Sequence, residues 1–172
     1  MQDYYRDRQN QDRRYRKRPE RSKKQPFSVR VQTLDGSIEW MPSRENSTDA
    51  SFTVKAKSFT DEELESYVLE PDARVLINSG FILDLMPGWE AQIRTKHNLA
   101  IDVGLAVLDS PSTIDSSHKD EIKIILVNNG EDDITLESGS EVAQMVVTKM
   151  PHVKLWHVEK IQSSVKDIES EQ

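Results

Sequence analysis

The strongest constraint on the fold is a succession of short apolar segments that fills most of the chain after residue 72. These segments are rich in Val, Ile and Leu, and turn signals separate them at Pro87-Gly88, Asp109 to Pro111, Asn129-Gly130 and Ser138-Gly139. Closely spaced strands with Gly, Pro and Asn between them are typical of a sandwich, jelly roll or barrel. The sequence therefore predicts an all-β domain, with strands expected within 26–33, 37–41, 51–57, 73–86, 90–96, 100–109, 121–129, 133–138 and 141–150.

One short helix is expected inside this β domain, at residues 58–71. Thr60 precedes Glu63 by three residues, which is the spacing of a capping box, and Pro71 closes the segment. After the last strand, Val158, Ile161, Val165 and Ile168 fit an amphipathic helix or an arm that docks on an apolar surface. A polar tail fits the same residues equally well.

The first 24 residues differ sharply from the rest of the chain. They hold ten Lys or Arg and four acids, whereas the remaining residues carry a net charge of −13. With no aliphatic side chain beyond Met1, this segment cannot bury enough surface to offset the entropy of ordering its backbone. We therefore expect a disordered basic arm over 1–26, a β domain over 27–158 and a polar tail or short helix over 159–172.

The basic arm suggests a nucleic-acid partner. Cations neutralise phosphates and the interleaved tyrosines can stack on bases; the cations expected to do so are Arg13, Arg14, Arg16, Lys17, Arg18 and Arg21. A solubilising or nuclear-import tail would have the same composition. Both interpretations stay open on the sequence.

Several classes of protein are excluded by what the chain lacks. It contains no cysteine, which rules out disulfides, thiolate metal sites and a cysteine nucleophile. No apolar run approaches the ~20 residues of a membrane span, so no membrane partner is expected. The N-terminal residues do not look like a secretory signal, which predicts an intracellular location, cytoplasmic or nuclear, or a virion. His152 and His157 would lie on opposite faces of a strand, so no metal site is expected.

Residues 80–150, which begin GFILDLMPGWEAQIRTKHNLAIDVG, resemble the core of the trimeric dUTP diphosphatases. Residues 41–54, MPSRENSTDASFTV, are similar to the segment that opens the first motif of that family. The resemblance covers roughly residues 27–158, in the motif order of the family. It implies a jelly-roll or β-clip barrel that forms a homotrimer, with active sites built between subunits.

The first two family motifs are altered here. The family pattern Ala-Gly-x-Asp-Leu corresponds to residues 50–54, where Thr53 replaces the acid that helps to organise the metal-bound triphosphate. A hydroxyl is a poorer partner than a carboxylate for Mg²⁺. The pattern Arg-Ser-Gly-Leu corresponds to residues 96–99, where Lys96 keeps the positive charge and His97 and Asn98 replace two small residues.

The third motif retains one residue of chemical interest. Asp115 corresponds to the general base of the family, and His118 takes the place of the tyrosine that packs on the deoxyribose. Both glycines of the uracil-reading hairpin are replaced. The sequence favours the other interpretation of Asp115, in which its carboxylate caps backbone amides in a turn.

The fourth motif corresponds to residues 139–144. Gln144 is retained, either as a ligand contact or as an interior amide, while Glu141 replaces an arginine. A carboxylate facing a triphosphate would oppose its binding. The residues after Met150 lack the Gly, Arg and Phe of the fifth motif.

The altered motifs favour a catalytically inactive homotrimer reused for binding or assembly, of which a viral structural protein is one version. In that case no cofactor is expected, and the weak nucleotide-binding set is Lys96, Asn98, His118 and Gln144. The alternative is a divergent dUTP diphosphatase that hydrolyses dUTP to dUMP and pyrophosphate with Asp115 and Mg²⁺. A third hypothesis is a regulator that binds a partner protein through the crevice in which the family binds its nucleotide.

Overall fold

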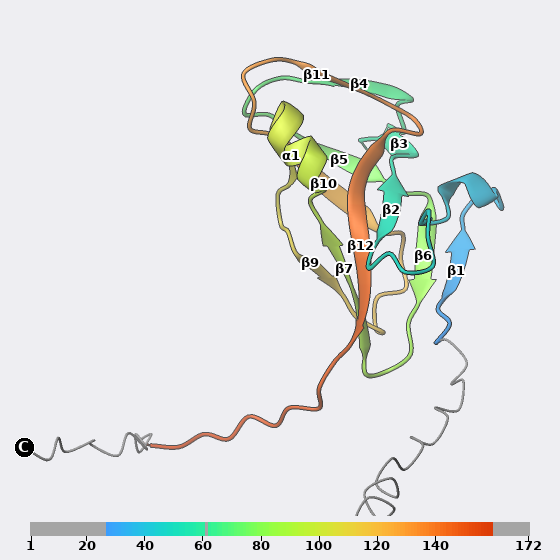
Figure 1. The fold of residues 1–172 in the computed structure, drawn as a ribbon, viewed down its shortest axis with the longest axis vertical. Coiled ribbons are helices and arrows are strands. Elements are labelled where there is room, and N and C mark those ends of the chain that lie inside the picture. The colour runs from blue at the N-terminus through green and yellow to red at the C-terminus, as the bar shows by residue number, and fades with distance from the viewer. Residues whose placement is uncertain (1–26, 61, 160–172) are drawn as a thin grey trace, which may run out of the picture.

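The structure is a computed structural model that describes residues 27–60 and 62–159 (Figure 1). The described part contains twelve strands, one α-helix and one 3-10 helix. In chain order they are β1 (Arg30–Thr33), η2 (Ile38–Trp40), β2 (Phe52–Lys55), β3 (Ser58–Phe59), β4 (Ser66–Leu69), β5 (Arg74–Asn78), β6 (Phe81–Asp84), β7 (Trp89–Arg94), α1 (His97–Val103), β8 (Leu105–Val107), β9 (Ser112–Ile114), β10 (Lys123–Asn128), β11 (Ile134–Glu137) and β12 (Glu141–Lys149).

Two four-stranded sheets form the body of the molecule. One has the strand order β3-β5-β10-β8 and the other the order β2-β12-β7-β9, and both are antiparallel. Two further pairs, β1-β6 and β11-β4, complete the described strands. In Figure 1 the β11-β4 pair lies beside α1 at one end of the body, and the segment after β12 runs away from the body.

The core is formed by the alternating inward side chains of both large sheets. Val54, Ile93 and Met145 of one sheet belong to the same buried cluster as Ile77 and Leu126 of the other. Because the strands are short and alternate inward and outward residues, each contributes only a few apolar side chains to this core. The prediction of an all-β fold with one short helix is confirmed.

The expected helix at 58–71 is wrong in position. Thr60 adopts φ 60° and Glu63 adopts φ 54°, so neither residue continues a right-handed helix. Phe59 instead bridges Leu64, and the fully buried Phe59 and Leu69 anchor β3 and β4. The Thr60 hydroxyl does accept a local bond, from the Glu62 amide, but it closes a turn.

The observed helix lies where the sequence predicts a strand. Residues 100–103 belong to α1, which ends at Gly104 with φ 72°, and only residues 105–107 of the expected strand form β8. Within the expected strand at 37–41, residues Ile38–Trp40 instead form η2. β9 was not expected, because Pro111 stands just before it.

Two predictions concern residues outside the described part of the chain. The basic arm lies there, together with Arg13, Arg14, Arg16, Lys17, Arg18 and Arg21, and so does most of the C-terminal helix or tail.

Within the described ranges, no helix combines the length and the apolar character that crossing a membrane requires.

Candidate functional site

Lys96 lies at a corner where β2, β12 and the end of β7 meet. Its ammonium group forms an ion pair with Glu141 and also donates to the Thr53 hydroxyl at 3.4 Å. Thr53 and Glu141 are both on the β2-β12 ladder, whose register shifts between Glu141 and Ala143. A bulge of this kind redirects a side chain, and here Glu141 meets Lys96.

Gln144 is committed to hydrogen bonds inside the protein. Its amide nitrogen donates to the Thr95 carbonyl at 2.8 Å, and its amide oxygen accepts from the Ser51 hydroxyl at 3.0 Å. The side chain therefore ties β2 and β12 to the segment that carries Lys96. This geometry matches the interior-amide interpretation of Gln144, since both ends of its amide already have protein partners.

Thr95 is held from its other side as well. Its hydroxyl accepts from the Val107 amide at 2.9 Å, and its own amide donates to the Ser110 hydroxyl at 3.4 Å. The backbone that precedes α1 is thus fixed between β7 and β8, and Lys96 is the N-cap residue of the helix. Asn98 is exposed on the first turn of α1.

Asp115 lies at the end of β9 and accepts two hydrogen bonds from one residue. The Ser117 hydroxyl and the Ser117 amide donate to its Oδ1 atom at 2.6 Å and 2.8 Å. The Ser117 hydroxyl is the main reason that the pKa of Asp115 is lowered, with smaller contributions from the Ser117 and His118 amides and the His118 charge. Asp115 is exposed, so an ionised carboxylate faces solvent at neutral pH.

His118 follows in the same turn, where its amide donates to the Asp115 carbonyl at 3.3 Å. Its Nε2 atom is buried and has no hydrogen-bond partner in the described part of the protein. Beside this turn, Asp84 forms ion pairs with Arg30 and with Lys119. Ser116 and these three charged residues line an open hollow.

The two groups of residues lie at opposite ends of one strand pair. In the β7-β9 ladder Ile93 faces Ser112 and Ala91 faces Ile114. Continued in both directions, this register leaves Lys96 and Asp115 six residues apart along the sheet, a separation of about 20 Å at about 3.3 Å per residue. A single chain therefore does not bring the lysine and the aspartate side by side.

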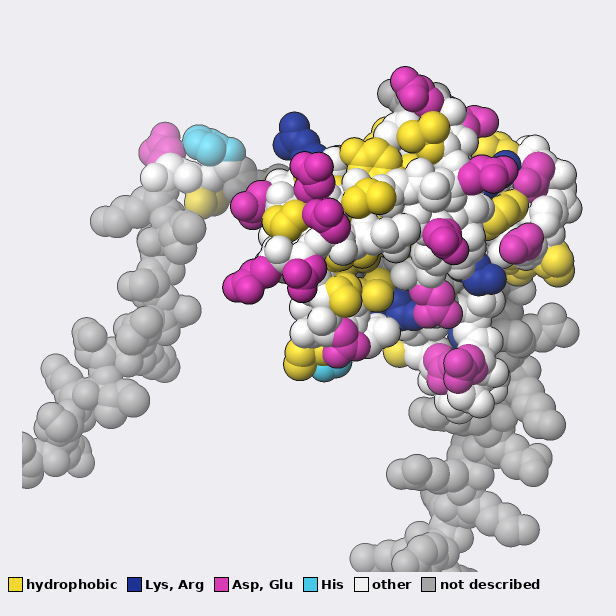
Figure 2. Space-filling view, turned by 90° about the horizontal axis from the view of Figure 1, so that it is seen from above, with side chains coloured by type: hydrophobic (Ala, Val, Ile, Leu, Met, Phe, Trp, Pro, Cys, Tyr) yellow, Lys and Arg dark blue, Asp and Glu magenta, His cyan; other side chains and the backbone are white. Residues whose placement is uncertain are grey.

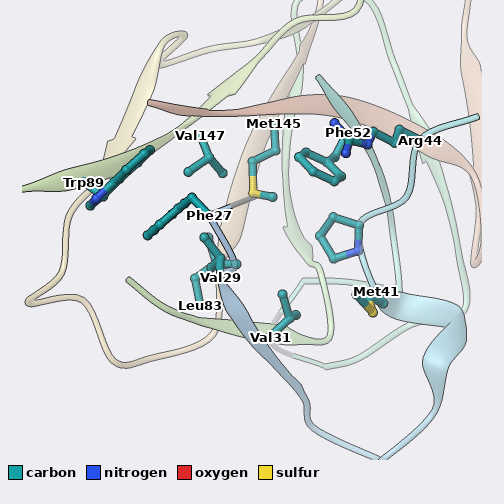
Figure 3. Close-up of a pocket in the computed structure, with 11 residues that line it drawn as sticks. Phe27, Val29, Val31, Met41, Arg44, Phe52, Leu83, Trp89, Met145 and Val147 are labelled. Carbon is teal, nitrogen blue, oxygen red and sulfur yellow. The ribbon is translucent and has the colours of Figure 1, made fainter. Parts of the chain in front are cut away.

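A separate apolar pocket of about 250 Å³ opens between β1 and β12 (Figure 3). Phe27 stacks on Trp89 at one side, with ring centroids 3.6 Å apart, and the Arg44 guanidinium covers the Phe52 ring at the other. Met145 and Val147 point into it from β12 (Figure 3). Its lining is apolar apart from Arg44, which makes it unsuited to a phosphate chain.

The surface of the β domain is mainly acidic, and its acidic side chains do not form a metal site in the described residues. Acidic side chains outnumber Lys and Arg on the face shown in Figure 2, in agreement with the acidic composition of the β domain. In residues 27–60 and 62–159, no three His, Asp or Glu side chains are grouped so that they could hold a metal ion.

Of the nucleotide-binding candidates from the sequence, Lys96, Asn98 and Gln144 lie around the start of α1, whereas His118 lies with Asp115 in the turn after β9. Thr53 and Glu141, which the sequence marks as departures from the family motifs, both contact Lys96. The hydroxyl and carbonyl partners, which are Ser51, Thr95 and Ser117, were missed. The Asp-x-Ser spacing at 115–117 was a readable signal, because aspartate commonly bonds the backbone two residues on. The roles of Ser51 and Thr95 depend on strand register, which no local pattern shows.

Comparison with known proteins gives a consistent result. The model of the dUTPase family matches residues 40–169. The deoxyuridine 5'-triphosphate nucleotidohydrolase of Agrobacterium fabrum is 39% identical over 128 residues, which is 74% of this chain and 80% of the relative. That of Bartonella henselae is 35% identical over 136 residues, which is 78% of this chain and 72% of the relative.

Solved structures show the same fold. The Staphylococcus bacteriophage 80alpha dUTPase with dUPNHPP aligns with a TM-score of 0.68 at 18% identity, over 84% of this chain and 96% of that one. The dUTPase of phage phi11 of S. aureus aligns with a TM-score of 0.66 at 18% identity, over 80% of this chain and 99% of that one. At this identity the likeness concerns the fold.

Proposed function

Since the chain belongs to the dUTPase family, we propose that it hydrolyses dUTP to dUMP and pyrophosphate with Mg²⁺. The observation that carries this proposal is Asp115, an exposed carboxylate whose pKa is lowered, at the position of the general base of the family. An ionised carboxylate can orient a water molecule and accept its proton. The relatives with 35–39% identity support the same reaction.

The prediction of a catalytically inactive protein, reused for binding or as a viral structural component, is therefore wrong. The relatives that match about three quarters of the chain are named as nucleotidohydrolases. That prediction rested on single residues that differ from the family motifs, and these differences are outweighed by the similarity of the chain to the nucleotidohydrolases. Contacts at these positions support the proposal: Lys96 has an ion pair, Gln144 bonds Ser51 and Thr95, and Asp115 bonds Ser117.

The other site residues have roles that follow from their contacts. Lys96 supplies a cation for the phosphate chain, and Gln144 holds the backbone of Thr95 so that Lys96 is positioned. His118, in the same turn as Asp115 and at the position of the family tyrosine, would pack on the deoxyribose. Asn98 is exposed on α1 next to Lys96 and can reach the same ligand.

Mg²⁺ fits this site as a partner of the substrate phosphates. Because the described residues offer no cluster of three His, Asp or Glu ligands, the phosphate oxygens and water would supply most of the coordination, as is common for Mg²⁺ with nucleotides. When bound, the ion neutralises charge on the phosphates. Thr53 stands at the position of the family acid. Its hydroxyl accepts a hydrogen bond from Lys96, so its role in the proposed site is to hold Lys96.

A homotrimer is part of the proposal, because one chain separates the two halves of the site. Lys96 and Gln144 of one copy would meet Asp115 and His118 of another. The segment after β12 supports such an assembly, since Leu155 is 94% exposed and Trp156 is 81% exposed in one chain. Large apolar side chains with so little cover are typical of an interface.

The test is an assay of the purified full chain with dUTP and Mg²⁺, in which dUMP and pyrophosphate are both measured. We expect turnover on the order of 1–10³ s⁻¹. Asp115→Asn should reduce it by about 10²–10⁴-fold, whereas Asp133→Asn, which removes a charge from an exposed loop, should leave it unchanged. No dUMP from the unmodified chain would refute the proposal.

Nucleic-acid binding by residues 1–24 is a second, separate proposal, supported by ten cations in 24 residues. Binding that neutralises six phosphates would fall with salt at a log–log slope of about −5. Deleting residues 1–24 should abolish retention of DNA and RNA at low salt and leave dUTP hydrolysis intact. Equal retention with and without the segment would exclude it.

A further inference from the structure

Glu141 places a negative charge at the position where the altered fourth motif meets Lys96. Lys96 is largely covered, with 18% of its side chain exposed, while 55% of the Glu141 side chain is exposed. The cation is therefore the more covered partner of the pair, and the carboxylate is the partner that faces solvent. Thr53 is the remaining polar partner of the ammonium group in the structure.

The contact has the properties of a displaceable counter-ion. Ion pairs with one exposed partner contribute little to stability, because water and salt compete for both charges. The contact lies where the β2-β12 register shifts, and the Glu141 side chain is more than half exposed there, so the contact does not depend on burial of the carboxylate. Removing the carboxylate should therefore leave the fold intact.

We propose that Glu141 is an internal competitor for the substrate phosphates: its carboxylate occupies Lys96 in the free protein, and a phosphate group must displace it to bind. The inference rests on the proposed function, in which Lys96 contacts the phosphate chain. Glu141 then sets how tightly the site holds a phosphate chain. If the substrate and the transition state both displace the carboxylate from Lys96 at the same free-energy cost, Glu141 raises KM and leaves kcat unchanged.

Titration calorimetry of the full chain with inorganic tripolyphosphate, at fixed low ionic strength, tests this directly. Glu141→Gln should bind tripolyphosphate more tightly by roughly three- to tenfold, because it frees Lys96 and removes one repulsive charge. Glu131→Gln is the matched control, since it makes the same chemical change at an exposed residue of the loop between β10 and β11. It should change the affinity little.

A double-mutant cycle separates release of Lys96 from simple loss of repulsion. In a Lys96→Met background, Glu141→Gln should give a clearly smaller gain, because no cation is left to release. An equal gain in both backgrounds would overturn the proposal. So would an equal gain from Glu131→Gln, or no gain from Glu141→Gln, including the case in which neither protein binds tripolyphosphate.

Kinetics keep this inference distinct from the proposed function. Active protein whose KM for dUTP is the same with and without Glu141→Gln would refute the competitor and leave the hydrolase standing. Tighter tripolyphosphate binding by Glu141→Gln in a protein that never releases dUMP would support the competitor at Lys96 and refute the hydrolase.

Discussion

At the scale of single residues, the site depends on side chains that hold other side chains in place. Gln144 does not face solvent with a free amide: it joins Ser51, just before β2, to the Thr95 carbonyl. Ser117 holds Asp115 in place, because its amide and its hydroxyl both donate to the Asp115 carboxylate. Changes at Gln144 and Ser117 are therefore expected to act on stability and ionisation, through the groups that they hold.

Gln144→Met should lower the free energy of unfolding by about 1–3 kcal/mol, because the half-buried Thr95 carbonyl and Ser51 hydroxyl lose their partner. Chemical denaturation monitored by tryptophan fluorescence measures it. Gln32→Met, on the exposed side of β1, is the control and should be close to neutral. Equal effects of the two changes would show that the bonds of Gln144 add nothing.

Ser117→Ala should raise the pKa of Asp115 toward its ordinary value of 3.8, because the hydroxyl bond is the largest cause of the lowering. A depressed carboxyl pKa contributes stability above the ordinary value, and this is lost as the pH falls through the lower, folded pKa. The variant should lose it at a higher pH than the unmodified protein. Carboxyl NMR titration measures the shift, with Ser116→Ala expected to leave the Asp115 curve in place.

At the scale of elements, the connection between α1 and β8 is the most constrained turn of the site region. Gly104 has φ 72°, and a Cβ there would lie 2.5 Å from the Gly130 nitrogen and 2.8 Å from the Gly130 Cα. Both the backbone conformation and the close approach require glycine. The loops after α1 and after β10 are packed against each other at this point.

Gly104→Ala should therefore destabilise the fold by about 3 kcal/mol or more, since it adds a backbone clash to an unfavourable φ. Gly36→Ala is the matched control: its φ of 76° is similar, but a Cβ there meets no heavy atom within 4 Å. We expect about 1 kcal/mol for that change. Thermal unfolding of both variants compares them, and equal losses would mean that the contact with Gly130 relaxes easily.

Much of the β architecture could be predicted from the sequence, because inward Val, Ile and Leu alternate along strands such as β10. The 58–71 segment could not, since a capping-box spacing cannot reveal that Thr60 takes a left-handed conformation. Residues 97–103 were missed because no side chain of α1 is fully buried and only Leu99 packs against the core, which leaves a weak helical pattern in the sequence. In the site, Lys96, Asp115 and Gln144 could be identified from their motifs, but their grouping depends on register.

At the scale of the whole molecule, the described chain does not assemble the proposed site by itself. Its two groups of site residues lie about 20 Å apart along one strand pair, and apolar residues after β12 have no cover within the described part of the chain. Both features are explained if copies associate. The proposed homotrimer is therefore the form in which the chemistry should be measured.

Replacing Leu155 and Trp156 together by Ser should weaken this association, because it removes the two most exposed large apolar side chains of the described C-terminal segment. Sedimentation velocity should show a trimer for the unmodified chain and smaller species for the variant at the same concentration. Ile38→Ser removes an apolar side chain that is 83% exposed elsewhere on the surface. That control should remain trimeric, and a trimeric double variant would contradict the assignment of the segment to the interface.

A site shared between copies is the central feature of the proposed enzyme, and mixing two defective variants tests it most directly. Asp115→Asn and Lys96→Met chains, each expected to be nearly inactive alone, are unfolded together, refolded in equal amounts and assayed for dUMP release. Random trimers should recover about one quarter of the unmodified activity, because one site in about four pairs an intact Asp115 with an intact Lys96 from different chains. Activity no higher than that of the separate variants, although mixed trimers have formed, would contradict a shared site.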